Sequence, residues 1–161
     1  TNREAEKGVC THSSGNHAQA VAYAAMKRNI PAYIVMPENA PKVKIQAVEG
    51  YNAKITLCKP TLKARRETLE KIAEKTGAYV VHPFNEPKVI AGQGTAALEL
   101  IEDVGDLDAI CAPIGGGGLM SGTCIAAKDM LPNVRLFGAE PKGAIGIILT
   151  GGNVDLSKLP F

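Results

Sequence analysis

The sequence predicts an α/β protein with open, twisted parallel sheets and helices on both faces, in three layers. Short runs of β-branched and apolar residues alternate with longer helical segments, which is typical of strand–helix–strand units. Polar or glycine-rich turns follow several strand-like runs, at the carboxyl ends where parallel sheets gather their functional groups. The chain has 161 residues, of which 45% are hydrophobic, and this is enough for a buried core.

The first half of the chain contains four predicted strands and three predicted helices. The strands are the apolar runs at 9–11, 32–36, 55–58 and 79–81. Helices are expected at 16–28, which is rich in alanine, at 41–50, which begins with proline and ends in glycine, and at 61–76. The last is amphipathic, and Gly77 is expected to end it. Its predicted inward residues are Leu62, Leu69, Ile72 and Ala73.

The second half repeats the alternation with fewer elements. Helices are expected at 96–104 and 119–131, and strands at 109–114 and 136–139. The segment Gly92-Gln93-Gly94-Thr95-Ala96-Ala97 fits a dinucleotide-binding pattern, but no clear strand precedes it, so we interpret it as a helix N-terminus. Two prolines bracket a polar turn at 82–87, where we expect the chain to cross between domains 8–85 and 86–161.

Composition excludes several classes of function. The net charge is +2 and lysines and arginines do not form long clusters, which argues against a nucleic-acid partner. No apolar run reaches the length of a membrane span. The four cysteines show no C-x-x-C spacing, so we expect reduced thiols in the core of a cytoplasmic protein. They are Cys10, Cys58, Cys111 and Cys124.

Four consecutive glycines, Gly115 to Gly118, lie between a predicted strand and a predicted helix. Without β-carbons, their amides can face one concavity, and the helix start adds a partial positive charge. This pattern predicts a site for an anion, most naturally a phosphate. A P-loop is excluded because no G-x-x-x-x-G-K-[ST] motif occurs. A flexible turn without a ligand is the alternative.

The segment THSSGNHAQA, residues 11–20, is unusually polar for a junction between a strand and a helix. Its serines and Asn16 could cap the following helix or bind a ligand, and the two roles are compatible. His17 is as consistent with a structural as with a functional role. His12 and His82 are interpreted as structural, hydrogen-bonded histidines.

Six motifs occur in the order and spacing of one enzyme family. They are Ser13-Ser14-Gly15-Asn16-His17, the run Ile30 to Pro37, His82-Pro83, Ala91-Gly92-Gln93-Gly94-Thr95, the four glycines, and Ala139-Glu140-Pro141. In these the chain resembles the fold-type II pyridoxal-phosphate enzymes, specifically the serine racemase and serine/threonine dehydratase family. The resemblance covers residues 8–141. It implies a small substrate-binding domain, 8–85, and part of a large cofactor-binding domain, 86–161.

The resemblance also implies a role for each loop. The cofactor phosphate is assigned to the backbone of the glycine turn and the next residue, Gly115, Gly116, Gly117, Gly118 and Leu119. Asn16 is assigned to the hydroxyl of the cofactor ring. The substrate is assigned to Ser13, Ser14, Asn16, His17 and Arg65. Ser14 is expected to be the second acid/base, because racemisation needs proton exchange on both faces of Cα. For Arg65, an exposed position on the outer helix face beside Arg66 is the equal alternative.

Further sites follow from the same resemblance. Gln19 and Tyr51 match positions near a nucleotide in some relatives. Glu140 and Ala144 match two of three ligands for a magnesium or calcium ion, but Gly146 stands where the family has aspartate. One carboxylate is too few for a hard cation. The implied partner is a small amino-acid substrate, and the complete enzyme is expected to be a homodimer.

The family's Schiff-base lysine lies in an S-F-K-[FIL]-R-G motif, which this sequence does not contain. We interpret the chain as an internal fragment and expect that alone it does not bind the cofactor covalently.

The predicted function is pyridoxal-phosphate-dependent racemisation or β-elimination of serine or threonine. Ser14 and Arg65 favour racemisation, whereas Phe84 favours dehydration. The alternatives are an L-threonine/L-serine ammonia-lyase without racemase activity, a non-catalytic domain that binds a phosphorylated ligand, and a Rossmann-type nucleotide module.

Overall fold

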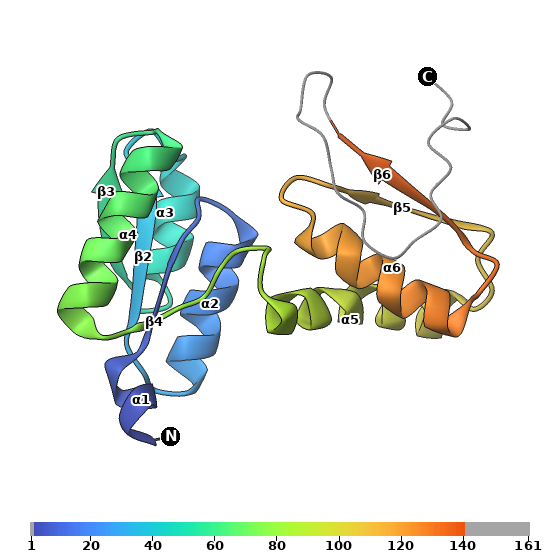
Figure 1. Cartoon of the computed structure of the whole chain (residues 1–161), viewed down its shortest axis with the longest axis horizontal. Coiled ribbons are helices and arrows are strands. Elements are labelled where there is room, and N and C mark those ends of the chain that lie inside the picture. Colours follow the sequence, from blue (N-terminus) through green and yellow to red (C-terminus); the bar gives the residue numbers. More distant parts are fainter. Residues whose placement is uncertain (1, 141–161) are drawn as a thin grey trace. The chain divides into compact units, whose positions relative to one another are not determined.

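The computed structural model describes residues 2–140, with side chains from residue 5 onward. Its internal contacts divide the chain into two compact units, Thr1–Pro83 and Phe84–Phe161 (Figure 1). The elements of the first unit are α1 (Asn2–Lys7), β1 (Val9–His12), α2 (Asn16–Lys27), β2 (Ala32–Pro37), α3 (Lys42–Glu49), β3 (Lys54–Cys58), α4 (Leu62–Thr76) and β4 (Tyr79–Val80). The four predicted strands and three predicted helices are present, and α1 is an addition.

The first unit is built on one parallel sheet with the strand order β3-β2-β1-β4. β1 therefore lies inside the sheet, where Cys10 is in register with Tyr33 of β2 and with Val80 of β4. Parallel strands place their carboxyl ends at one edge. The polar segment that follows β1 consequently starts at the middle of that edge.

Helices cover both faces of this sheet, as predicted. On one face, α2 and α3 pack against β2 in a cluster that contains Ala18, Ile34 and Val48. On the other face, α4 contributes Leu69 to a cluster with Cys10 and Val35. β2 is apolar along most of its length and Thr11 of β1 is buried, because both faces of the sheet are covered.

The bounds of α4 follow from its capping residues. The Thr61 hydroxyl accepts a hydrogen bond from the Ala64 amide at 3.2 Å, and Gly77 ends the helix in the left-handed conformation with φ of 70°. Leu69 is buried as predicted, but the expectation that Leu62 faces inward is wrong, since 55% of Leu62 is exposed. Leu62 is the first residue of the helix.

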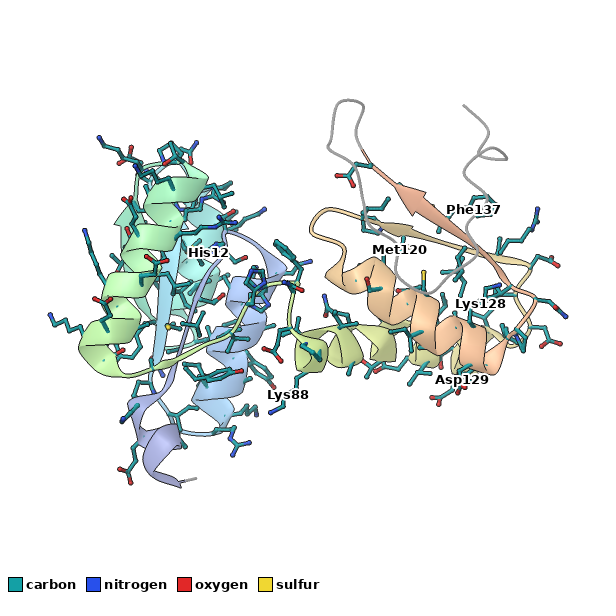
Figure 2. The ribbon with its side chains drawn as sticks, viewed as in Figure 1. His12, Lys88, Met120, Lys128, Asp129 and Phe137 are labelled. Atoms are coloured by element: carbon teal, nitrogen blue, oxygen red, sulfur yellow. The ribbon has the colours of Figure 1, made fainter. Side chains whose placement is uncertain are left out.

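The second unit contains α5 (Pro87–Val104), β5 (Ala109–Pro113), α6 (Gly118–Met130) and β6 (Arg135–Ala139). β5 and β6 pair in parallel. Both helices share one hydrophobic cluster with the inner face of the strands, and Met120 of α6, labelled in Figure 2, is 1% exposed within it. Among the described residues, no helix is long and apolar enough to cross a membrane.

α5 begins nine residues before the predicted start, at Pro87, so the interpretation of the segment after Gly92 as a helix N-terminus is wrong. Glu86 is the N-cap, and its side chain accepts a hydrogen bond from the Lys88 amide. Gly94 lies in mid-helix, and a β-carbon there would be 3.0 Å from the carbonyl oxygen of Gly122 on α6. Gly94 therefore allows two helices to approach closely, whereas nothing lies within 4 Å of the β-carbon position of Gly92.

All four cysteines are free thiols. Cys10 and Cys124 are buried and Cys58 is partly buried, which agrees with the expectation of core thiols. Cys111 does not agree with that expectation, because it is exposed. In β5 the buried residues Ile110 and Ala112 alternate with exposed ones, and Cys111 lies on the exposed face.

Candidate functional site

The loop between β1 and α2 is fixed by its own backbone. The Ser13 amide donates to the Val35 carbonyl of β2 at 3.1 Å, and the Ser13 hydroxyl accepts a bond from the Gly15 amide at 3.3 Å. The N-cap of α2 is Gly15, and no side chain makes the capping bond. The helix-capping alternative is therefore wrong. The half-buried Ser14 and the exposed Asn16 are not used to cap α2.

The carbonyl group of Val81, just after β4, contacts side chains on both sides of the β1–α2 loop. The Thr11 hydroxyl, fully buried, donates to the Val81 carbonyl at 2.7 Å, and His17 Nε2 lies 3.2 Å from the same oxygen. Burial lowers the pKa of His17, and the hydrogen bond to Val81 partly opposes that shift. His17 is thus seen in a structural contact, whereas Thr11 was not singled out by the sequence.

Positive charge collects beside the same loop. The pKa of His12, labelled in Figure 2, is lowered first by burial and then by the charges of His82, Arg65, Arg66 and His17. Arg65 is only partly exposed and its Nε is buried without a hydrogen-bond partner, while Arg66 is exposed. A buried guanidinium nitrogen without an acceptor favours an anionic ligand.

The glycine turn between β5 and α6 offers backbone instead of side chains. Gly115 and Gly117 have φ of 52° and 87°, in the left-handed region that favours glycine. Gly117 is the N-cap of α6, and no side chain caps this helix. Helix geometry leaves the amides of Gly118, Leu119 and Met120 without an intrahelical acceptor, at the positive end of the helix dipole. This arrangement can bind an anion.

Phe84 packs against the glycine turn, which the sequence did not predict. A β-carbon at Gly116 would collide with the Phe84 ring, and one at Gly118 would lie 3.0 Å from Phe84 Cα. The contact joins residues that are far apart in the sequence, and its only local signal is the aromatic residue after His82-Pro83.

Of the two residues matched to a nucleotide, Tyr51 lies in an aromatic pair. Its ring centroid is 5.4 Å from that of Tyr23 at an interplanar angle of 70°, and Lys27 Nζ is 5.5 Å from the Tyr23 centroid. Gln19 is half-buried on α2, the helix that also carries Tyr23 and Lys27.

Of the residues matched to a cation site, Glu140 follows β6, and its Oε2 is buried without a hydrogen-bond partner. Ala144 lies outside the described residues. Within residues 5–140, no group of three or more histidine, cysteine, aspartate or glutamate side chains could hold a metal ion.

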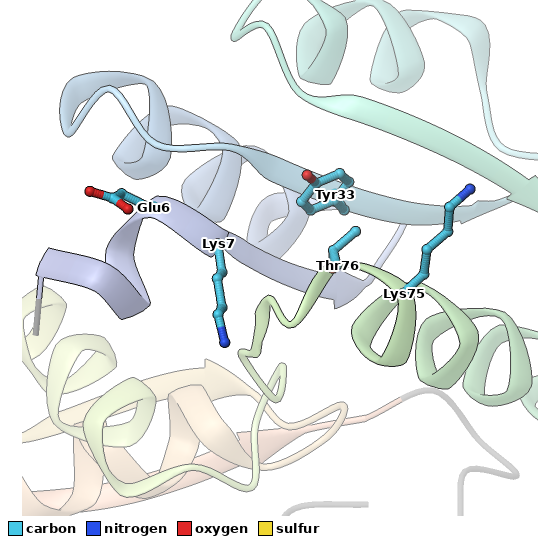
Figure 3. A pocket seen from close by; sticks show the side chains of 5 residues that line it. All are labelled: Glu6, Lys7, Tyr33, Lys75 and Thr76. Carbon is cyan, nitrogen blue, oxygen red and sulfur yellow. The ribbon is translucent and has the colours of Figure 1, made fainter.

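A cavity of about 620 Å³ lies near the amino ends of β1 and β2, at the sheet edge opposite the β1–α2 loop. Glu6, Lys7, Tyr33, Lys75 and Thr76 line it (Figure 3). The amino groups of Lys7 and Lys75 point in different directions in Figure 3, so they do not converge on one ligand. This cavity therefore adds no residue to the candidate ligand contacts.

Comparisons with known proteins show the family of this chain. Residues 1–151 match the family described as pyridoxal-phosphate dependent enzyme. The chain is 55% identical over 141 residues to a serine racemase of Dictyostelium discoideum, covering 88% of this chain and 44% of that protein. It is 52% identical to a β-hydroxyaspartate dehydratase of Paracoccus denitrificans, covering 88% of this chain and 45% of that protein.

Solved structures give the same result. The crystal structure of the Dictyostelium discoideum serine racemase superposes with a TM-score of 0.80 at 53% identity, over 89% of this chain and 47% of that one. The processed threonine deaminase isoform 2 of Solanum lycopersicum gives 0.81 at 40% identity, over 89% and 42%. The chain spans less than half the length of these relatives, and it belongs to the pyridoxal-phosphate-dependent enzymes.

Proposed function

We propose that the complete protein is a pyridoxal-phosphate enzyme that racemises serine, deaminates serine or threonine by β-elimination, or does both. The observation that carries this proposal is the glycine turn at 115–118. Two of its glycines have positive φ, and the amides at the start of α6 lack both a side-chain cap and intrahelical acceptors. Such a turn fits the phosphate group of the cofactor.

The two units offer different parts of the cofactor and substrate contacts. The amides of Gly115, Gly116, Gly118 and Leu119 would hold the phosphate, whereas Gly117, whose amide donates to the Ile114 carbonyl, would shape the turn. Asn16 would bind the hydroxyl of the cofactor ring. When bound, pyridoxal phosphate withdraws electrons from the substrate's Cα. The other roles belong to this chain's own residues, which orient the substrate and move protons.

We assign the substrate carboxylate to the β1–α2 loop. Ser13 is fixed by its bonds to Val35 and Gly15, so it can position an anion without first being ordered. Arg65, with its buried and unpartnered Nε, adds positive charge. We also assign His17 to the substrate, although its Nε2 contacts the Val81 carbonyl. Ser14 Oγ would give or take the proton at Cα on one face of the substrate.

A product assay on the complete enzyme tests this function. Enzyme saturated with pyridoxal phosphate is given L-serine, and D-serine is measured by chiral chromatography while pyruvate is measured by a coupled assay. We expect at least one of the two products. L-Threonine is tested in parallel, with 2-oxobutanoate as the product measured. Formation of neither product from L-serine, together with no 2-oxobutanoate from L-threonine, would overturn the proposal and would favour the non-catalytic alternative, a domain that binds a phosphorylated ligand.

An ammonia-lyase without racemase activity is the second candidate. Two observations favour it: the resemblance matches Phe84, after His82-Pro83, to the dehydratases, and the chain is 40% identical to a threonine deaminase over 89% of its own length. The product assay separates the candidates, because a pure ammonia-lyase forms pyruvate and no D-serine. A Rossmann-type nucleotide module would bind NAD rather than pyridoxal phosphate.

Two further ligands are proposed. Glu140 would supply a carboxylate to a magnesium or calcium ion, since its buried Oε2 has no partner. The matched Ala144 lies outside the described residues. Gln19 and Tyr51 would contact a nucleotide, with the Tyr51–Tyr23 ring pair as an aromatic surface. We also propose that the complete enzyme is a homodimer. We propose further that it is cytoplasmic, because the four cysteines of this chain are free thiols.

A further inference from the structure

The glycine turn at 115–118 has an open side and a closed side. The β-carbon positions at Gly115 and Gly117 have no described atom within 4 Å. At Gly116, a β-carbon would be 2.8 Å from Phe84 Cε1 and closer still to Cδ1 and Cγ. At Gly118, it would be 3.0 Å from Phe84 Cα and 3.3 Å from the Phe84 carbonyl oxygen. Phe84 therefore forms the closed side, with its ring on one glycine and its backbone on another.

The Phe84 ring lies outside the buried hydrophobic cluster of this unit. The hydrophobic cluster of this unit consists of residues from α5 and β5 through β6, and Phe84 is not one of them. The residue is 39% exposed, so more than half of its surface is removed from water although it lies outside that cluster. Because the hydrophobic gain scales with the area removed from water, this burial stabilises the position of the ring beside the glycine turn.

The ring does remove conformational freedom from the turn. A run of glycines loses more backbone entropy on ordering than any other sequence. Within the turn, the Gly117 amide is held by a bond to the Ile114 carbonyl at 2.8 Å, and Gly116 lies between the two glycines of positive φ. Contact with an aromatic ring limits the backbone conformations open to Gly116. The amides that follow Gly116 are therefore attached to a backbone that is already ordered.

We propose that Phe84 is a positioning residue, which keeps the glycine turn in its anion-binding conformation and so raises the affinity for the cofactor phosphate. The proposal rests on the proposed function, because it takes that phosphate as the ligand of the turn. Phe84 acts through the glycine backbone and need not touch the substrate. Without the ring, the turn would have to be ordered at the moment of binding, which lowers affinity.

The first test compares two cofactor forms on the complete apoenzyme. Dissociation constants for pyridoxal phosphate and for pyridoxal, which lacks the phosphate, are measured by equilibrium dialysis with the Phe84→Ala and Phe84→Leu variants. We expect Phe84→Ala to weaken pyridoxal phosphate binding about tenfold, the cost of ordering roughly one more residue on binding, with pyridoxal changed less than about twofold. Phe84→Leu should lie between. Leu100→Ala on α5, a residue 40% exposed, is the matched control and should bind as the parent does.

The second test is a double-mutant cycle on the same turn. Gly116 has no positive φ, so Gly116→Ala should weaken binding only by colliding with the ring. In the Phe84→Ala background that collision is gone. The double variant should therefore lose about as much affinity for pyridoxal phosphate as Phe84→Ala alone, rather than the product of the two single losses. Gly117→Ala, with φ of 87° and open space around it, should instead combine independently with Phe84→Ala.

The outcomes distinguish a failure of the proposed function from a failure of the role assigned to Phe84. If the parent apoenzyme shows no saturable binding of pyridoxal phosphate, the proposed function fails. If the parent binds and Phe84→Ala binds equally well, only the role of Phe84 is overturned. Equal weakening for pyridoxal and pyridoxal phosphate overturns it too, because the phosphate turn is then not the part affected. Hydrogen exchange at the amides of 116–120 should also be faster in both Phe84 variants than in the parent, and unchanged exchange contradicts the proposal.

Discussion

The loop after β1 and the turn after β5 have the same place in their units and opposite chemistry. Each follows the carboxyl end of a parallel strand, and each begins a helix whose N-cap is a glycine, Gly15 or Gly117. The first loop carries serines, an asparagine and histidines beside Arg65, while the turn carries no side chain. One architecture therefore supports two kinds of ligand contact. The first loop offers side chains that can exchange protons, and the turn offers backbone amides that can only donate hydrogen bonds to an anion.

The largest expected effect separates the chemistry of the two regions. Ser14→Ala in the complete enzyme should lower D-serine formation by about 10² to 10⁴-fold, the usual contribution of a positioned acid/base. Pyruvate formation should fall by less. Ser121→Ala, which removes a half-buried hydroxyl from the first turn of α6, is the control and should leave both rates near the parent values. Equal loss of both products in Ser14→Ala would remove the role assigned to Ser14.

A second comparison concerns the strands that lead into the two regions. Cys10 of β1 is 0% exposed and burial raises its pKa, whereas Cys111 of β5 is exposed. In this chain a maleimide should label Cys111 at least about a hundredfold faster than Cys10, whose reaction needs local opening. Mass-spectrometric mapping of a labelling time course measures both rates. Similar rates would mean that the sheet of the first unit is not closed around β1.

The two capping glycines should differ in what they tolerate. Gly117→Ala places a side chain at φ of 87° and should lower the free energy of unfolding by about 1–2 kcal/mol. Gly15 has φ of −135° and nothing within 4 Å of its β-carbon position, so Gly15→Ala should cost at most about 0.5 kcal/mol. Urea unfolding of the two variants makes the comparison, and a larger loss for Gly15→Ala would contradict it.

The smallest expected effect is a pH dependence that belongs to the first region alone. Burial is the main cause that lowers the pKa of His12 and of His17, so the unfolded chain binds these protons more readily than the folded one. The free energy of unfolding should therefore be undiminished above the ordinary histidine pKa of 6.5 and should fall as the pH drops through the lowered values. Urea unfolding at a series of pH values should show a flatter profile in His12→Gln/His17→Gln. A profile as steep as the parent's would place the effect elsewhere.

Local features of this fold could be predicted because their causes are local. Strand-like runs, the cap at Gly77 and the loops at strand ends all depend on neighbouring residues. The errors have tertiary causes. Leu62 has the right spacing for burial but, as the first residue of its helix, is left exposed, and the glycine at 94 serves a neighbouring helix rather than a helix start. Cys111 is exposed because the described residues cover only one face of β5.

The same distinction applies to the candidate site. The residue types of both loops indicated their chemistry, and the resemblance assigned the roles. No pattern indicated that Phe84 lies on Gly116, or that Thr11 and His17 meet at one carbonyl group. These contacts depend on how distant segments fold onto each other, and sequence periodicity does not encode them.

The shared carbonyl of Val81 has a consequence for biosynthesis. It lies 70 residues after Thr11 and 64 after His17, so the hydrogen bonds that brace the β1–α2 loop cannot form until that much more chain has left the ribosome. β1 likewise waits for β4 as its second neighbour. Contacts of such long range form slowly. The loop should therefore be among the last parts of the first unit to mature, and a nascent chain arrested before residue 81 should leave it accessible to proteases.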